Sequence, residues 1–365
     1  MSANTSVTWL EELASRMNID VDWMDPKYIK SVPIKLQDQT SNQIWLHMQM
    51  SDVSNQATLA AVVAQLKGEH WLAVYRRMAV LLCEKNLALI AGRVLVQTSP
   101  SDAYDTTKTL EHARLYDREF QTLGIPRNRY CIKILATGPG IVAARILQQE
   151  GISTLGTGVF SVEQAIACSQ ARCLYISPYY NEVRTHEDPS LWPDVDDPAT
   201  QHPFSNRILQ MIEVYKHLFK VSGEQQPLMK LAAFRSIKEV IAAAELGCYS
   251  ATLSPTTLDE LSQAMYDRSM NLGTKVLKSD LVNMISNQVP ERLRDLLKTD
   301  PLIPGGFRPA RTDIDYLANN GAELEKAILS DAACKVRLND AIAMFMRAET
   351  ASKTLIEGVL QRSAL

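Results

Sequence analysis

One lysine in this chain is placed where an amine could act as a nucleophile. Lys133 stands inside the run Tyr-Cys-Ile-Lys-Ile-Leu-Ala at residues 130–136, whose two alternating faces are otherwise apolar. Such a run is typical of a strand that is covered on both sides. Burial disfavours an ammonium group and lowers its pKa, and a neutral amine can form a Schiff base with a ketone or aldehyde. The alternative is a lysine whose stem packs on apolar surface while its ammonium reaches water.

The pattern around this run predicts an α/β protein. Short apolar runs alternate with amphipathic helical patterns along most of the 365 residues. Eight strands with helices between them favour a (β/α)8 TIM barrel with extra N- and C-terminal helices. A doubly wound open sheet is the alternative, but no Gly-x-Gly-x-x-Gly loop follows the first strand. The expected strands are 19–24, 34–38, 88–98, 130–136, 154–160, 173–178, 229–234 and 250–254, and expected helices include 104–123, 140–150, 162–171, 206–219 and 237–246.

Polar residues lie at or just after the ends of these expected strands. In a barrel the carboxyl ends of the strands converge on one face, where active sites form. A single polar residue at a strand end is commonly a turn or capping residue, whereas a set around one central lysine predicts an active site. The residues placed in this way are Asp22, Asp38, Thr40, Asn42, Gln97, Thr157, Ser177, Tyr179 and Arg235.

Composition limits the partners that this site could have. The net charge of −3 gives no support for binding to nucleic acid or to a membrane surface, and no apolar stretch approaches the roughly 20 residues that span a bilayer. The first residues lack a secretion signal, so a cytoplasmic location is expected. The six cysteines and six histidines are scattered, which predicts buried free thiols and no metal site. A small-molecule ketone or aldehyde is the expected partner.

The chain is expected to form one barrel domain with a helical extension. The barrel is expected over about residues 19–300, and residues 310–365 read as helical from about 312 to 359 without strands. We expect these C-terminal helices to pack on their own barrel, over its mouth, or on a second copy in a homodimer.

The segment around the lysine resembles the transaldolase family. It reads Ile-Lys-Ile-Leu-Ala-Thr-Gly-Pro-Gly-Ile-Val-Ala-Ala over residues 132–144 and looks like the family's Schiff-base segment. Further likeness lies at Val21-Asp22, at Asp38 with Thr40 and Asn42, at 232–235 and at 253–255, so that the resemblance runs from about residue 19 to 300. It implies a class I aldolase mechanism on a (β/α)8 barrel, without metal or organic cofactor, and assembly into dimers or larger rings.

The resemblance also implies roles for individual residues. Lys133 would form the imine, and Asp22 would take or return the proton of the hydroxyl beside the bond that breaks. Asn42 would hydrogen-bond the bound donor fragment, with Thr40 beside it in the substrate-binding set, and Thr157 would help to orient the catalytic water. The alternatives are structural: a helix-capping aspartate, a turn asparagine, and a buried strand threonine bonded to backbone.

Two departures from the family concern proton transfer. Gln97 stands where transaldolases proper carry a glutamate, and an amide can hold a water but cannot accept its proton in the same way. Tyr179 stands where they carry a phenylalanine. The pair resembles the fructose-6-phosphate aldolase branch, in which the tyrosine takes over acid–base work. The alternative for Tyr179 is an aromatic residue that packs a loop at the barrel mouth.

Other departures concern the binding of phosphate. Ser177 and Arg235 match the family's phosphate site, but Glu182 replaces a second arginine and would repel a dianion. Leu155 replaces an asparagine that contacts the substrate, while Arg184 could compensate if the loop is shifted. These changes favour an apolar or unphosphorylated substrate.

Three functional hypotheses follow. The leading one is an imine-forming aldolase or aldol-transferase with a modified, non-phosphorylated substrate. The second is a true transaldolase that acts on sedoheptulose 7-phosphate and glyceraldehyde 3-phosphate, against which Glu182 and Gln97 argue. The third is a barrel that has lost catalysis and serves as a binding module, against which the joint presence of Lys133, Asp22 and Thr157 argues.

Overall fold

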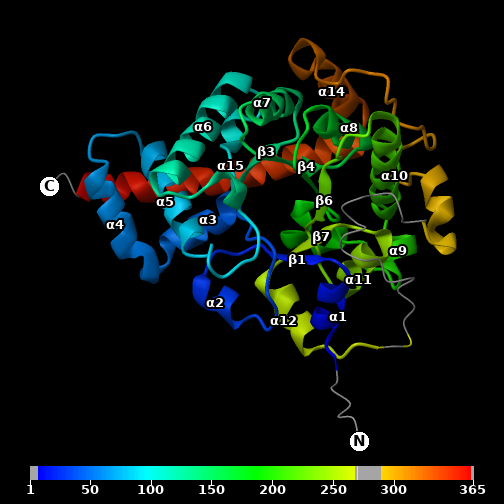
Figure 1. Ribbon diagram of the computed structural model, residues 1–365, viewed down its shortest axis with the longest axis horizontal. Coiled ribbons are helices and arrows are strands. Elements are labelled where there is room, and N and C mark those ends of the chain that lie inside the picture. The colour runs from blue at the N-terminus through cyan, green and yellow to red at the C-terminus, as the bar shows by residue number, and fades with distance from the viewer. Residues whose placement is uncertain (1–6, 268, 270–288, 363–365) are drawn as a thin grey trace, which may run out of the picture.

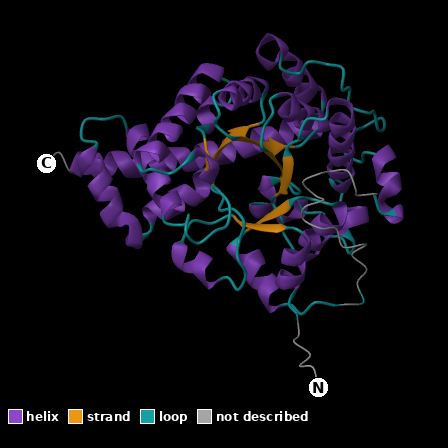
Figure 2. Cartoon of the chain, viewed as in Figure 1, coloured by secondary structure: helices purple, strands orange, loops and turns teal. Residues whose placement is uncertain are grey.

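The computed structural model describes residues 7–267, 269 and 289–362, and within them a parallel sheet curls around a centre with helices outside it (Figures 1 and 2). All pairings between its seven strands are parallel, in the order β1-β7-β6-β5-β4-β3-β2. The strands are β1 (Asn18–Val21), β2 (Val94–Gln97), β3 (Tyr130–Leu135), β4 (Thr154–Val159), β5 (Tyr175–Pro178), β6 (Leu228–Leu231) and β7 (Ser250–Leu253).

Helices occupy the connections between the strands, as the sequence predicted. Ser161 shows how local chemistry sets their starts: its hydroxyl accepts from the backbone N–H of Gln164, whose side chain accepts from the backbone of Ser161 in return. The helices are α1 (Trp9–Arg16), α2 (Pro26–Ser31), α3 (Gln43–Ser51), α4 (Gln56–Gln65), α5 (Trp71–Glu84), α6 (Thr106–Thr122), α7 (Gly138–Gln149), α8 (Val162–Gln170), α9 (Pro198–Gln201), α10 (Ser205–Ser222), α11 (Ile237–Leu246), α12 (Pro255–Gln263), α14 (Ala318–Ser330) and α15 (Ala332–Arg362).

The prediction of a strand at 34–38 is wrong, and the predicted strand at 88–98 shrinks to β2. A single residue, Gln39, bridges both edge strands of the sheet, pairing with Val21 of β1 and Val94 of β2. Backbone hydrogen bonds join this segment to both edges, among them Val21 N–H to the Asp38 carbonyl (3.0 Å) and Gln39 N–H to the Arg93 carbonyl (3.0 Å), but two carboxylates interrupt the regular ladder. The backbone N–H of Asp38 donates to Asp20 Oδ1 (3.1 Å), and the N–H of Arg93 donates to Asp38 Oδ1 (2.6 Å). The two edges therefore meet through one bridging residue, so that seven strands rather than eight are present in the described residues.

The last helix, α15, packs against this same protomer at the carboxyl ends of the strands. It contacts α3, the turn Pro100–Asp102 that follows β2, and the 3₁₀ helix η4 (Val183–His186) that follows β5. In Figure 1 it runs in red across the length of the view. This agrees with the expectation that the C-terminal helices pack on their own barrel.

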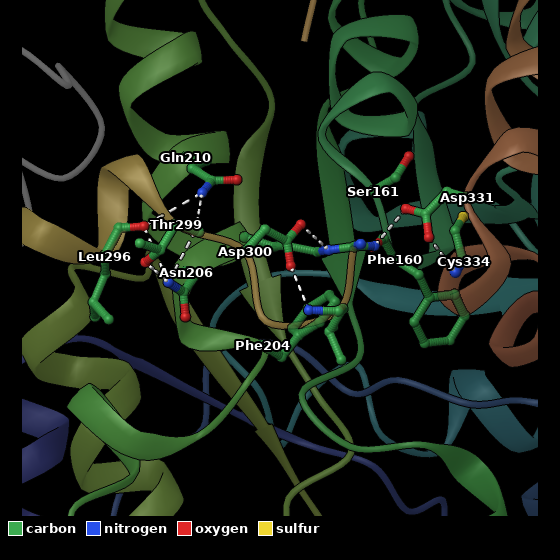
Figure 3. Close-up of polar contacts among 12 residues, drawn as sticks. Phe160, Ser161, Phe204, Asn206, Gln210, Leu296, Thr299, Asp300, Asp331 and Cys334 are labelled. Carbon is green, nitrogen blue, oxygen red and sulfur yellow. Dashed lines mark hydrogen bonds and ion pairs between the residues drawn. The ribbon is translucent and has the colours of Figure 1, made fainter. Parts of the chain in front are cut away.

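A buried ion pair fixes the start of α15. Arg207 of α10 bonds Asp331, directly before α15, through Nη1 (2.7 Å), and Asp300 through Nε (2.9 Å). Its Nη1 also donates to the carbonyl of Phe160 (2.6 Å), while Asp331 caps the helix by accepting from the N–H of Cys334 (3.0 Å). Figure 3 shows Asp300 and Asp331 on either side of this contact. Because Arg207 is 1% exposed and its charge is balanced here, the contact resists separation of α15 from α10.

All six cysteines are buried and free, as the sequence predicted. Among the described residues, the helices are too short or too polar to cross a lipid bilayer.

Candidate active site

A cavity of about 390 Å³ opens at the carboxyl ends of the strands, where the site was predicted. Six of the ten predicted residues line it: Asp22, Thr40, Asn42, Lys133, Ser177 and Tyr179. Lys133 and Ser177 are on β3 and β5, and Asp22 and Tyr179 directly follow β1 and β5. Thr40 follows the bridging residue Gln39, and Asn42 is the N-cap of α3. The parallel sheet brings them together because it turns every strand's carboxyl end to the same side.

Lys133 is buried in this cavity without a carboxylate partner. Its side chain is on β3, the residue is 5% exposed, and Nζ donates to the backbone carbonyl of Ser41 at 3.0 Å. Among the described residues no acidic group lies within ion-pair distance of Nζ. Burial lowers the pKa of Lys133, and the negative charge of Asp22 opposes this only in part. The amine therefore has a larger neutral, nucleophilic fraction than an exposed lysine.

A second buried lysine in the sheet has the opposite environment. Lys230 on β6 pairs with Asp20 at 2.9 Å and with Asp38 at 2.8 Å, and none of the three is exposed to solvent. Burial alone would lower the pKa of Lys230, but the two carboxylates raise it well above its usual value. Lys230 is thus a permanent cation inside the sheet, and burial alone does not distinguish a reactive lysine from a structural one.

Asp22 faces the cavity and is held by two donors. The hydroxyl of Thr40 donates to Oδ1 at 2.5 Å, and the indole N–H of Trp45 donates to Oδ2 at 2.7 Å. The structural alternative for Asp22 fails, because the residue that caps the next helix, α2, is Asp25. A carboxylate with both oxygens bonded keeps a fixed orientation towards the cavity.

Tyr179 and Thr157 form a hydroxyl pair beside the lysine. Their oxygens lie 2.9 Å apart, and the Tyr179 ring packs edge-on against Phe160. Burial raises the pKa of Tyr179, and the negative charge of Asp22 raises it further. The hydrogen bond with Thr157 lowers this pKa but does not cancel the effect of burial. The phenol therefore stays protonated at neutral pH. Thr157 is buried and reaches the cavity only through this contact, since it does not line the cavity itself.

Asn42 caps a helix and also lines the cavity. Its side-chain oxygen accepts from the backbone N–H groups of Ile44 (2.9 Å) and Trp45 (3.2 Å), which makes it the N-cap of α3. The amide nitrogen remains as a donor towards the cavity. Ser177 lines the same cavity from β5.

Four predicted residues do not line the cavity. Thr157 is one, and Gln97 is another: it is buried beside Lys133 in the strand register, with neither polar atom of its amide bonded to protein. Arg235 donates from Nη1 to His186 Nδ1 (3.0 Å), and Glu182 pairs with Arg337 of α15 at 3.3 Å. Roles for these side chains in catalysis or binding remain predictions.

Several residues that line the cavity were not predicted from the sequence. The indole of Trp45 and the apolar pair Met344 and Phe345 of α15 line the cavity, as do His186 and Glu187 of the loop after β5. Trp45 lies three residues after Asn42, on the first turn of α3, so the capping pattern could have suggested it. Nothing in the local sequence of α15 places its apolar residues at the mouth of the barrel.

Together these features define a class of protein, one with a curled parallel α/β sheet and an unpaired buried amine at the carboxyl ends of its strands. Comparison with known families agrees. The family model described as "Transaldolase/Fructose-6-phosphate aldolase" matches residues 18–296. The chain belongs to this family.

Individual relatives support the assignment. A protein named "Transaldolase" from Synechocystis sp. is 31% identical over 251 residues, which cover 67% of this chain and 61% of that protein. "Transaldolase" of Nostoc punctiforme is 31% identical over 76% of this chain and 81% of its own length, and that of Gloeobacter violaceus is 29% identical over 83% and 66%. The matches to the Synechocystis and Gloeobacter proteins thus span less than two thirds of those relatives.

Proposed function

We propose that this chain is an enzyme of the transaldolase type, which breaks and makes a C–C bond through a Schiff base on Lys133. The observation that carries the proposal is the buried Lys133 amine, which lines the cavity, has no carboxylate partner among the described residues and has a lowered pKa. A lowered pKa enlarges the neutral fraction of the amine, which is the form that attacks a carbonyl carbon. We also take the seven strands, closed by the segment that contains Gln39, as a (β/α)8 barrel.

The first half-reaction would release an aldehyde. The Lys133 amine adds to the ketone carbon of a donor, and loss of water from the carbinolamine gives a cationic imine. Asp22 then takes the proton from the hydroxyl on the carbon beyond the breaking bond, and the electrons of that bond move into the imine. An enamine on Lys133 and a free aldehyde result. Thr40 and Trp45, which hold Asp22, keep its carboxylate aimed at that hydroxyl.

The second half-reaction would reverse these steps on another aldehyde. The enamine carbon bonds to the acceptor carbonyl carbon, whose oxygen receives the proton held by Asp22. Water then adds to the regenerated imine, and Lys133 leaves as the free amine. The protonated phenol of Tyr179, bonded to Thr157, is positioned to donate and recover protons in the addition and loss of water. Asn42 and Ser177 would bind hydroxyl groups of the donor fragment.

Two sets of substrates are compatible with this chemistry. The names of the relatives favour a true transaldolase, which transfers a unit from sedoheptulose 7-phosphate to glyceraldehyde 3-phosphate. Glu182 in place of an arginine and the Gln97 amide favour a modified, non-phosphorylated substrate. Both candidates use the same imine chemistry, so the reaction type does not depend on the choice.

Trapping of the imine tests the reaction type. The protein is incubated separately with dihydroxyacetone, fructose 6-phosphate and sedoheptulose 7-phosphate in the presence of borohydride, and its peptides are analysed by mass spectrometry. We expect a reduced adduct on Lys133 and none on Lys230, which serves as an internal control because it is equally buried but charged. Absence of any adduct on Lys133 would contradict the proposal and favour a binding module. An adduct with only the phosphorylated sugars, followed by transfer to glyceraldehyde 3-phosphate, would select the true transaldolase.

A further inference from the structure

The part of the cavity beyond the amine is apolar. Ile44, Leu155 and Val183 contribute to its wall from the barrel side, and Met344 and Phe345 close it from α15. Among the residues that the structure describes, no arginine lines the cavity, and the only lysine in its wall is Lys133, whose amine would react. A phosphate dianion is normally bound by arginine or lysine side chains through charge-assisted hydrogen bonds. The cavity offers instead a surface suited to hydrocarbon.

Arg235 bonds a residue of the cavity wall through Nη1 and does not line the cavity itself, while its buried Nε has no hydrogen-bond partner among the described residues. Arg235 donates to His186 and lies over the ring of Trp192, with its guanidinium carbon 5.8 Å from the ring centre. Burial lowers the pKa of His186, and the Arg235 charge lowers it further, so the imidazole that lines the cavity is neutral at neutral pH. Glu187 adds a carboxylate to the lining. A dianion would therefore meet a neutral ring and a carboxylate that is already paired with Arg347.

Charges of the loop after β5 instead hold α15 in place. Each of three residues in this loop forms an ion pair with a residue of α15, and one of the three is the glutamate at the position of the lost arginine. Together with the buried contact at the start of the helix (Figure 3), these pairs connect the loop to the helix that carries Met344 and Phe345. The pairs are Glu182 with Arg337 (3.3 Å), Arg184 with Asp340 (3.6 Å) and Glu187 with Arg347 (2.7 Å).

From this arrangement we infer that the acceptor is an unphosphorylated aldehyde whose apolar substituent binds against Met344 and Phe345. The inference rests on the proposed imine chemistry and specifies its second substrate. The enamine carbon on Lys133 bonds to the aldehyde carbon, the aldehyde oxygen takes the proton from Asp22 and becomes a hydroxyl, and water releases the ketone product from Lys133. The substituent takes no part in these steps, so its binding to the apolar wall sets specificity.

Acceptor competition tests the inference. Dihydroxyacetone serves as the donor: its imine on Lys133 becomes the enamine when the neighbouring carbon loses a proton to Asp22. The alternative acceptors are 3-phenylpropanal and glyceraldehyde 3-phosphate, and the aldol products are quantified by mass spectrometry. We expect kcat/KM to be at least about tenfold higher for 3-phenylpropanal, the order of discrimination that an apolar pocket gives. For Phe345→Ala we expect a fall of about tenfold or more with 3-phenylpropanal, while the borohydride adduct on Lys133 still forms.

Two further variants make the result specific. Met346 is on the same helix but 41% exposed and outside the cavity lining, so Met346→Ala is the matched control and should change neither acceptor's kcat/KM. Phe345→Leu keeps an apolar side chain, and it should lose less than Phe345→Ala if packing is the cause, with folding of each variant checked by circular dichroism. A preference for glyceraldehyde 3-phosphate, or equal losses of kcat/KM in the Phe345 and Met346 variants, would overturn the inference. The imine chemistry would still stand if the Lys133 adduct formed. Absence of that adduct would overturn both.

Discussion

Removal of charge from the two buried lysines should have very different effects on stability. Lys230→Met would leave Asp20 and Asp38, both fully buried, without their cation. Breaking a buried pair in this way costs about 3–5 kcal/mol of the free energy of unfolding. Lys133→Met removes an amine that has one hydrogen bond, to the carbonyl of Ser41, worth about 1 kcal/mol, and also removes the cost of burying its charge. We therefore expect Lys133→Met to lose no more than about 1 kcal/mol at pH 7.

The lowered pKa of Lys133 adds a dependence on pH with a definite sign. The unfolded chain holds this proton up to a pKa of about 10.4, whereas the folded protein releases it at lower pH. Between the two values the unfolded state binds more protons, so the wild type gains stability as pH rises. Relative to Lys133→Met, which lacks the group, the gain should be about 1.4 kcal/mol per pH unit within that interval.

Urea unfolding of the wild type and both variants at several pH values between 7 and 10 measures these differences. Other titrating groups affect the wild type and Lys133→Met equally and cancel in their difference. If Lys133→Met lost as much stability as Lys230→Met, the amine would have to be a paired cation. If the difference between the wild type and Lys133→Met were flat over this range, the pKa of Lys133 would not be lowered. Either result would refute the reasoning from burial.

Four changes test the chemistry directly. Lys133→Arg should abolish both turnover and borohydride trapping, because guanidinium stays protonated and forms no imine; measurable turnover by the purified variant would contradict this. The wild-type kcat/KM should fall as pH is lowered through the pKa of Lys133, since the protonated amine is not a nucleophile, and a profile that rises towards acid would exclude that role. Tyr179→Phe removes the hydroxyl bonded to Thr157 and should slow turnover by about 10²–10⁴-fold while the Lys133 adduct still forms. An unchanged rate would show that the tyrosine has no part in acid–base catalysis. Trp45→Phe removes one donor to Asp22, worth about 1.5–3 kcal/mol, and should lower kcat by about tenfold or more with little change in KM; a change in KM alone would assign Trp45 to binding.

Most of the fold was predictable because its strands have short, local signals. Strands β3 and β4 match the predicted runs at 130–136 and 154–160 to within a residue. Both are buried along their whole length; β3 is apolar apart from Lys133, and β4 combines apolar residues with Thr and Gly. The segment at 34–38 alternates apolar and polar residues, as a strand would, but does not form a regular strand. The backbone N–H of Asp38 donates to the Asp20 carboxylate, which interrupts the ladder, and both carboxylates pair with the buried Lys230. Composition of the segment alone does not contain that information.

The candidate site also has features that the sequence predicts and features that it does not. Lys133, Asp22 and Tyr179 could be placed together because parallel strands bring their carboxyl ends to one face, so position along each strand was enough. Burial could be expected for Lys133, but the absence of a counter-charge could not, since the other buried lysine of the sheet is paired twice. The wall formed by Met344 and Phe345 depends on the path of a helix far along the chain. The orientation of that helix is set by tertiary contacts.

The glutamate at position 182 illustrates why residues at such a site have to be considered in pairs. In the sequence alone it weakens a phosphate site by placing a carboxylate where a cation is expected. In the folded chain this carboxylate is paired with the buried Arg337, which offsets the cost of burying that cation. The same α15 carries Met344 and Phe345 into the cavity. The charge change in the loop and the apolar wall are therefore parts of one arrangement. The carboxylate that replaces an arginine of the phosphate site binds, through Arg337, the helix that carries the apolar wall.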